Sequence, residues 1–196
     1  MSHHQILIVY ATSYGQTQKI ALRMRDQLAT LEFGVEVANV DDFPPEPKLQ
    51  EFDGVIVLGS IIRGRHSRRL QRYVIRHRAD LPGGSSAFCS VSGSAGSKNA
   101  REREEAERML QRFLNDTGWR PALHATFAGA MAFTKYSPIV RWVMKRISRK
   151  EGGPTDTSRD HELTDWTQVE AFTRRFADVV VMTSGAFGVA SLGSDR

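Results

Sequence analysis

Short continuous runs of apolar residues alternate along the chain with stretches whose apolar residues recur every three or four positions. The clearest runs are 5–10 (QILIVY) and 54–59 (GVIVLG), which have the length and composition of strands buried on both faces. Weaker strand candidates cover 35–40, 87–91 and 123–130. Strands of this kind are typical of parallel sheets, so the five segments predict one five-stranded parallel sheet.

Four amphipathic helices are predicted between and after these runs. Their apolar faces are formed by Ile20, Met24, Leu28 and Leu31; by Leu70, Tyr73 and Val74; by Ala106, Met109, Leu110, Phe113 and Leu114; and by Trp166, Val169, Phe172, Phe176 and Val180. Helices that alternate with parallel strands cover both faces of the sheet. The sequence therefore predicts an α/β fold with a doubly wound sheet.

We expect one domain over 1–182, because the sequence contains neither an internal repeat nor a linker. One stretch, about 131–161, interrupts the alternation with basic and aromatic residues, two adjacent glycines and a proline. A connection of this length in a compact domain is usually functional or disordered. We interpret it as a long insertion in or beside the fifth strand. The small residues of 183–196 predict a disordered tail.

The first predicted strand leads directly into a loop rich in hydroxyl side chains, and a helix follows. Its residues are Thr12, Ser13, Tyr14, Gly15, Gln16 and Thr17. Hydroxyls and backbone N–H groups at a helix start suit a phosphate monoester, because donors converge there and the helix dipole adds partial positive charge. The same residues could merely cap the helix. Their position after the first strand of an α/β pattern favours phosphate binding.

The stretch 8–21 (IVYATSYGQTQKIA) resembles the phosphate-loop signature of the flavodoxins. This resemblance implies a flavodoxin-like fold and a bound FMN, whose phosphate lies in the loop just described. It also implies that two further loops, after the third and fourth strands, flank the flavin ring, since ligands of such sheets lie beyond the carboxyl ends of the strands. The residues implied are Ser60, Ile61, Ile62, Arg63 and Gly64 in one loop, and Ser90, Val91, Ser92 and Gly93 in the other.

A more specific resemblance extends from about residue 5 to residue 181. The chain resembles the flavodoxin-like, menaquinone-dependent protoporphyrinogen dehydrogenases of bacterial haem synthesis, which carry a long inserted loop. The most specific matches are 152–157 (GGPTDT) and 164–166 (TDW). The resemblance implies an FMN enzyme that dehydrogenates protoporphyrinogen IX and passes the electrons to a membrane quinone, menaquinone or ubiquinone. Residues 92–103 depart from the pattern, being richer in glycine and charge.

The insertion itself contains a candidate membrane helix. Taken as a helix, it places apolar residues on one side (Ile139, Val140, Trp142, Val143, Met144 and Ile147) and Arg141, Lys145 and Arg149 on the other. A tryptophan beside a basic polar face is typical of an interfacial helix on anionic lipid. The alternative is an amphipathic helix packed on the domain core. The substrates implied by the resemblance favour lipid, and we group Lys135, Gly152, Gly153, Thr155 and Asp156 with this membrane and substrate insertion.

Composition limits the remaining possibilities. Lys and Arg number 27 against 22 Asp and Glu, so the formal net charge of the 196 residues is +5. The single cysteine, Cys89, excludes an internal disulfide framework and a cysteine-rich zinc site. No run approaches the roughly 18 apolar residues of a membrane-spanning helix, and no secretory signal is visible. We expect a cytoplasmic protein, peripheral on the inner face of the cell membrane.

Alternative functions stay open at this point. An electron-carrier flavodoxin is disfavoured because such carriers are typically acidic near the flavin. An NAD(P)H:quinone reductase would need a nicotinamide site, for which no motif is visible. We expect no nucleic-acid partner, because the arginine cluster at 63–78 lacks interleaved aromatic residues and a known motif. Whether the chain forms a homo-oligomer is open.

The sequence identifies no definite catalytic residue, as expected where a flavin carries the chemistry. Arg63 is a weak candidate that could meet the flavin, a porphyrin propionate or only solvent. Asp156 could be an acid or a turn residue, and Asp165 an acid or a helix cap. We expect His66 and His77 on the surface. His124 and His161 lack ligand-spaced partners, so we predict no metal.

Overall fold

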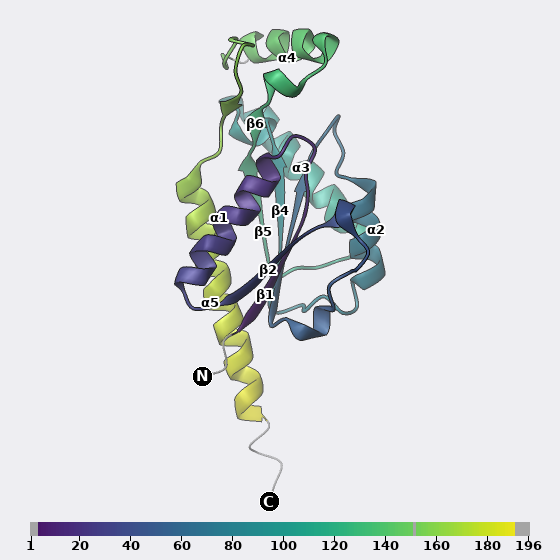
Figure 1. Ribbon diagram of the computed structural model, residues 1–196, viewed down its shortest axis with the longest axis vertical. Helices are drawn as coiled ribbons and strands as arrows, with labels where there is room; N and C mark the ends of the chain where they lie inside the picture. The colour runs from purple at the N-terminus through teal and green to yellow at the C-terminus, as the bar shows by residue number, and fades with distance from the viewer. Residues whose placement is uncertain (1–3, 151, 191–196) are drawn as a thin grey trace, which may run out of the picture.

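A five-stranded parallel sheet forms the centre of the molecule (Figure 1). The computed structural model describes residues 4–150 and 152–190. The strands lie in the order β2-β1-β3-β4-β5, and they are β1 (Gln5–Ala11), β2 (Gly34–Asn39), β3 (Gly54–Ser60), β4 (Ser86–Ser92) and β5 (Leu123–Ala128). All five predicted strands and their parallel pairing are confirmed.

Four helices cover the two faces of the sheet. α1 (Gln16–Thr30) and α5 (Trp166–Ala190) pack on one face, and α2 (Arg68–His77) and α3 (Ala100–Thr117) pack on the other. Successive residues of a strand point to opposite faces, which explains the continuous apolar runs. In β1, Ile6 and Ile8 join the core beneath α1 and α5, whereas Leu7 and Val9 join the core beneath α2 and α3.

Short 3-10 turns fill several connections: Val40–Asp42, Leu49–Glu51, Ser94–Gly96 and Phe133–Lys135. Leu31, expected on the apolar face of the first helix, is 41% exposed because α1 ends one residue earlier. The chain switches direction between β1 and β3, which is where doubly wound sheets bind their ligands.

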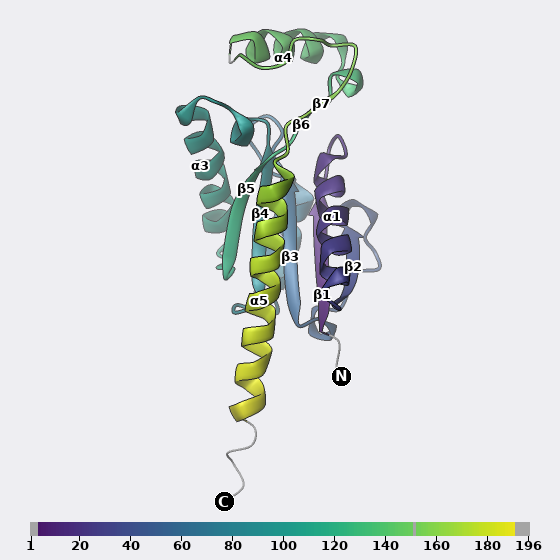
Figure 2. The same ribbon diagram turned by 90° about the vertical axis from the view of Figure 1, so that its left-hand side faces the viewer.

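The insertion follows β5 and extends beyond the carboxyl end of the sheet, at the top of Figures 1 and 2. It begins with β6 (Ala130–Met131) and ends with β7 (His161–Glu162), which pair antiparallel. Between them lies α4 (Pro138–Lys150), which crosses above the sheet at an angle to its strands. The insertion therefore stands over the ligand-binding edge of the fold.

The last helix continues further than the sequence suggests. α5 runs to Ala190, so residues 183–190 are helical, which differs from the expected disordered tail. The Thr183 hydroxyl donates to the carbonyl of Val179, one turn earlier, and to that of Gly84. Residues 191–196 lie outside the described residues. Within 4–150 and 152–190, no helix is both long enough and apolar enough to cross a membrane.

Candidate functional site

The phosphate loop, residues 12–17, joins β1 to α1 at the carboxyl edge of the sheet. Gly15 has φ 96°, a left-handed conformation that glycine adopts without strain, and its N–H donates to Thr12 Oγ1 at 2.9 Å. No side chain caps the N-terminus of α1. The interpretation as a mere helix cap is therefore disfavoured, because the first N–H groups of the helix remain available to an anion.

Thr17 adds a second indication of an anion site. Its side chain is 1% exposed, and its Oγ1 has no hydrogen-bond partner among the described residues. A buried hydroxyl without a partner costs free energy, so such a group in a native fold calls for an explanation. A phosphate oxygen in the pocket above α1 would accept this hydrogen bond.

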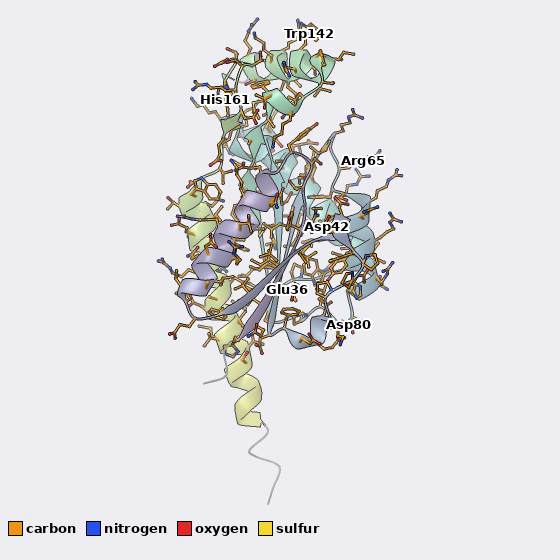
Figure 3. All side chains as sticks on the ribbon, viewed as in Figure 1. Glu36, Asp42, Arg65, Asp80, Trp142 and His161 are labelled. Carbon is orange, nitrogen blue, oxygen red and sulfur yellow. The ribbon has the colours of Figure 1, made fainter. Side chains whose placement is uncertain are left out.

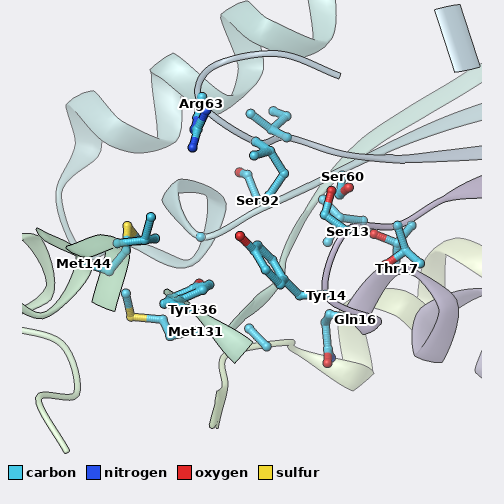
Figure 4. Close-up of a pocket in the computed structure, with 18 residues that line it drawn as sticks. Ser13, Tyr14, Gln16, Thr17, Ser60, Arg63, Ser92, Met131, Tyr136 and Met144 are labelled. Carbon is cyan, nitrogen blue, oxygen red and sulfur yellow. The ribbon is translucent and has the colours of Figure 1, made fainter. Parts of the chain in front are cut away.

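The loop between β3 and α2, residues 61–67, forms a tight turn over the pocket. Ile62 and Arg65 exchange two backbone hydrogen bonds, and between them Arg63 and Gly64 both have positive φ, 51° and 74°. Two consecutive positive φ values are characteristic of a type I′ turn. Arg63 therefore holds a conformation that few non-glycine residues adopt. Its side chain points into the space above Tyr136 (Figure 4).

His66 ties this loop to the end of β4, which contradicts the expectation of a surface residue. Its Nε2 lies 3.0 Å from Ser90 Oγ, and its ring makes edge contacts with Phe88 and Phe113. Burial lowers the pKa of His66 to about 4, so the ring is neutral at physiological pH. Ser90, predicted to bind the cofactor, is fully buried and instead positions the two loops.

An inner pocket of about 200 Å³ lies among these loops (Figure 4). It brings together twelve of the predicted cofactor residues: Thr12, Ser13, Tyr14, Gln16, Thr17, Ser60, Ile61, Ile62, Arg63, Val91, Ser92 and Gly93. Gly15 shapes the loop, and Gly64 lines the next cavity instead. The amide of Gln16 turns away from the pocket and donates to Thr164 Oγ1 at 2.8 Å.

The insertion supplies one wall of this inner pocket, whereas the sequence assigned it only to the membrane and the substrate. Met131, Tyr136, Val140 and Met144 all line it. The i, i+4 spacing of Val140 and Met144 indicates an apolar side of the helix. It does not indicate which way that side faces. Burial raises the pKa of Tyr136, whose ring meets Tyr14 edge-on at 5.0 Å between centroids.

An outer cavity of about 570 Å³ continues from the inner pocket. It lies between the loop at 61–67, the start of α3 and the underside of α4, and it shares Ile61, Arg63, Ser92, Gly93, Met131 and Met144 with the inner pocket. Gly152 and Gly153 line it on the insertion side. The N–H of Gly153 donates to the carbonyl of Ser148, and a Cβ on Gly153 would lie 2.7 Å from Ser148 Oγ.

Hydrogen bonds attach the insertion to the phosphate loop. Lys135 Nζ donates to the carbonyl of Tyr14 at 2.7 Å. Thr164 Oγ1 accepts from Gln16 and donates to the carbonyl of Ala128 at 2.8 Å. The Thr-Asp-Trp motif thus has a structural explanation: its threonine joins the insertion exit to α1, and Asp165 Oδ1 accepts from the N–H of Gln168 as a helix cap.

The remaining predicted residues of the insertion divide into internal and outward-facing groups. Arg141 donates from Nε to the carbonyl of Phe133 and from Nη2 to the carbonyl of Tyr136, so it fastens α4 to the preceding turn. Ile139, Trp142 and Val143 are exposed, with Trp142 at the outer end of the molecule (Figure 3), whereas Ile147 is partly exposed and also lines the outer cavity. The assumption that all apolar residues of α4 share one surface is wrong, because Val140 and Met144 face the pocket.

Asp156 lines neither cavity. Its carboxylate accepts from the N–H and the hydroxyl of Ser158 and pairs with Arg159 at 3.1 Å. Hydrogen bonds from Ser158 lower the pKa of Asp156, which favours the turn interpretation over an acid role. Thr155 lines neither cavity either. Across the described part of the chain, no three His, Cys, Asp or Glu residues are grouped to hold a metal.

Known proteins place this architecture in a family. Residues 7–158 match the flavodoxin domain, and the chain belongs to the flavodoxin-domain family. Among curated proteins it is similar to protoporphyrinogen IX dehydrogenase (quinone) of Escherichia coli strain K12, with 34% identity over 171 residues, covering 87% of this chain and 93% of that protein.

Solved structures agree on the fold. Flavodoxin 1 of Bacillus cereus aligns over 89% of this chain and 97% of its own with a TM-score of 0.50 and 14% identity. The Flv1 flavodiiron core of Synechocystis aligns over 92% of this chain with a TM-score of 0.55 and 16% identity, and the alignment spans 36% of that protein. At these identities the likeness establishes the fold alone.

Proposed function

We propose that this protein is an FMN-dependent dehydrogenase that oxidises protoporphyrinogen IX and passes the electrons to a membrane quinone. The observation that carries the proposal is a flavodoxin-type pocket that opens into a second cavity roofed by an insertion. The Escherichia coli relative, which aligns over 87% of this chain, is named for this activity.

The phosphate end of the inner pocket fits FMN. A phosphate monoester requires hydrogen-bond donors and a close approach to the backbone. The uncapped start of α1 and the unpaired, buried Oγ1 of Thr17 provide the donors, and the left-handed Gly15 allows the close approach. When bound, FMN supplies the acceptor and donor of the electrons. The residues of the chain hold the cofactor, orient the substrate and exclude water from the pocket.

Anaerobic turnover tests the activity. We expect FMN-loaded protein in quinone-containing micelles to convert protoporphyrinogen IX into fluorescent protoporphyrin at a rate that depends on the quinone. Flavin reduction by NAD(P)H with no porphyrin formed would instead support the reductase alternative. Flavin that exchanges electrons only with protein partners would support the carrier.

Thr17→Val tests the cofactor site, because it removes the hydroxyl and keeps the shape of the side chain. We expect FMN to bind at least tenfold more weakly, as the loss of one hydrogen bond to a charged group predicts. Thr30→Val, at the exposed end of the same helix, is the matched control and should leave FMN affinity unchanged. Equal FMN affinity in wild type and Thr17→Val would place the phosphate elsewhere.

The outward face of α4 suits an anionic lipid surface. Ile139 is 78% exposed and Trp142 64% exposed, and the exposed Arg146, Arg149 and Lys150 lie on the same helix. A helix that exposes large apolar residues beside basic ones typically lies in the membrane interface. The inner leaflet of the cell membrane carries the anionic lipid that attracts such a helix. A site open beneath α4 would then receive its lipid-soluble substrates from the membrane.

Sedimentation with vesicles tests the membrane contact. We expect wild type to bind phosphatidylglycerol vesicles and to bind neutral phosphatidylcholine vesicles far less. Ile139→Ser with Trp142→Ser should reduce binding at least tenfold, because two exposed apolar side chains are lost. Leu31→Ser with Ile75→Ser is the control, since both residues are about 40% exposed, Leu31 just after α1 and Ile75 on α2. Equal loss in both pairs would argue against α4 as the contact.

A further inference from the structure

The outer cavity has a predominantly apolar lining of the kind that encloses a large organic ligand. Seven apolar side chains contribute to it: Ile61, Met109, Met131, Met144, Ile147, Pro154 and Leu163. Its volume of about 570 Å³ lies within the range of roughly 300–1,000 Å³ that is usual for small-molecule sites. Met131, Met144 and Ile147 come from the insertion, so the cavity is formed where the insertion meets the body.

Two cations stand in this apolar cavity without an anionic partner. Arg63 lies at the end shared with the inner pocket, and Lys98 lies just before α3. Among the described residues, neither side chain has a hydrogen bond or an ion pair. Arg63 holds a positive φ of 51° at the turn, which sets the direction in which its side chain leaves the backbone. Several other arginines have an acidic partner, as Arg69 has in Asp41 and Arg76 in Glu46.

The cavity also contains carboxylates, and these restrict the number of acidic groups that a ligand could carry. Glu102 and Glu105 line it, and Glu105 pairs with Arg108 at 2.8 Å. Like charges repel strongly at close range in a partly enclosed site. A ligand with two carboxylates finds two cations, whereas a ligand with four brings its extra carboxylates against Glu102 and Glu105.

We propose that the outer cavity is a binding site for a dicarboxylic tetrapyrrole, with its two propionates on Arg63 and Lys98. The proposal rests on the proposed function and names the residues that select its substrate. Arginine pairs with a carboxylate in a planar, two-bonded geometry, so Arg63 sets the orientation of the ring toward the inner pocket. Lys98 contributes a second, less directional contact.

Equilibrium binding of the stable product tests the site without turnover. The probes are protoporphyrin IX and its dimethyl ester, titrated into FMN-loaded protein and followed by visible absorbance. We expect Arg63→Gln to weaken binding of the free acid about tenfold or more, since a charge-assisted hydrogen bond is lost, and to leave the ester unaffected. Lys98→Gln should weaken the free acid by a smaller factor, about threefold.

Arg65→Gln is the matched control. It removes the same charge two residues away on the same turn, and Arg65 lines neither the inner pocket nor the outer cavity. We expect it to bind both probes as wild type does. Coproporphyrin, with four propionates, should bind wild type more weakly than protoporphyrin does. Glu102→Gln should reduce this difference in affinity between the two porphyrins.

Three results would overturn the proposal. Arg63→Gln could bind the free acid as wild type does, or it could lose the acid and the ester equally, or it could lose FMN affinity, which would assign Arg63 to the flavin. Failure of the function is a separate outcome. If wild type binds protoporphyrin with the expected charge dependence but does not oxidise protoporphyrinogen IX, the result supports the binding site and refutes the dehydrogenase activity.

Discussion

The sheet body and the insertion are held together by different kinds of interaction. In the body, each neighbouring pair of strands is registered over six residues, and two apolar cores lie on opposite faces. The insertion is closed by a ladder of two residue pairs, and its own core has four buried residues: Met131, Ala132, Phe133 and Tyr136. Its helix α4 leaves Ile139 and Trp142 largely exposed.

This difference shows where stability and function reside. Burial of apolar surface dominates the stability of the body, because β1, β3 and β4 are covered on both faces. The insertion has little surface to bury, and it depends on polar attachments such as Lys135 to the Tyr14 carbonyl and Gln16 to Thr164. Regions with few buried contacts open locally at lower free energy than the core does. We therefore expect the insertion to open locally while the sheet stays folded.

The largest expected effect separates the two cores. Phe176 of α5 and Phe133 of the insertion are both fully buried. Phe176→Ala should lower the free energy of unfolding of the whole protein by about 3–5 kcal/mol, as a large cavity in the main core predicts. Phe133→Ala should cost global stability much less and should instead open the insertion. Urea denaturation measures the first effect, and hydrogen exchange of residues 131–161 measures the second.

Equal losses of global stability in the two variants would contradict this comparison. They would mean that the insertion unfolds together with the sheet as one cooperative unit.

The second expected effect concerns the body alone and depends on pH. The pKa of His66 is about 4 in the folded protein, against 6.5 for an unperturbed histidine. As pH falls below 6.5 the unfolded chain takes up this proton first, so folding loses stability between pH 6.5 and about 4. The full loss is about 3 kcal/mol at 1.36 kcal/mol per pKa unit. Urea denaturation at a series of pH values measures it.

His66→Gln should remove this part of the pH dependence and His124→Gln, on the exposed end of β5, should not. The same slope in wild type and His66→Gln would show that another group titrates.

Much of the sheet body could be predicted from local patterns. The runs at 5–10 and 54–59 predicted strands covered on both faces, and β1 and β3 are indeed the central strands. The phosphate loop could be predicted too, because its position after the first strand is fixed by connectivity. In these regions the side chains that matter lie close together in sequence, so spacing alone carries the information.

His66 could not be predicted, because its environment is formed by distant segments. The sequence around it is rich in arginine, which indicates a surface. The ring is buried because Gly59 leaves room for it: a Cβ at Gly59 would lie 3.0 Å from His66 Cδ2 and 2.7 Å from Leu70 Cδ2. Ser90, its hydrogen-bond partner, comes from the next strand. A glycine in a buried strand was the only local signal, since it often marks a close approach.

The orientation of α4 could not be predicted for a related reason. Periodicity shows that a helix has an apolar side, but α4 has two apolar surfaces: Val140 and Met144 face the pocket, while Ile139 and Trp142 face outward. The basic side was equally ambiguous. Arg141 binds backbone carbonyls, which every residue carries, and therefore no sequence pattern identifies its partners.

The smallest expected effect tests whether polar attachments hold the insertion. Arg141→Gln removes the contacts to the carbonyls of Phe133 and Tyr136, and charge-assisted hydrogen bonds of this kind contribute about 1–2 kcal/mol. Lys145→Gln, one turn further along α4, removes the same charge. Among the described residues, the Lys145 side chain makes no hydrogen bond and no ion pair. Hydrogen exchange of α4 should accelerate about tenfold in Arg141→Gln and stay unchanged in Lys145→Gln, with the strands unaffected in both. If exchange of α4 accelerates equally in both variants, net charge, and not the fastening of the helix to its turn, governs the insertion. If neither variant changes the exchange of α4, apolar contacts such as those of Phe133 are enough to hold the insertion. The insertion then differs from the sheet body only in the size of its core.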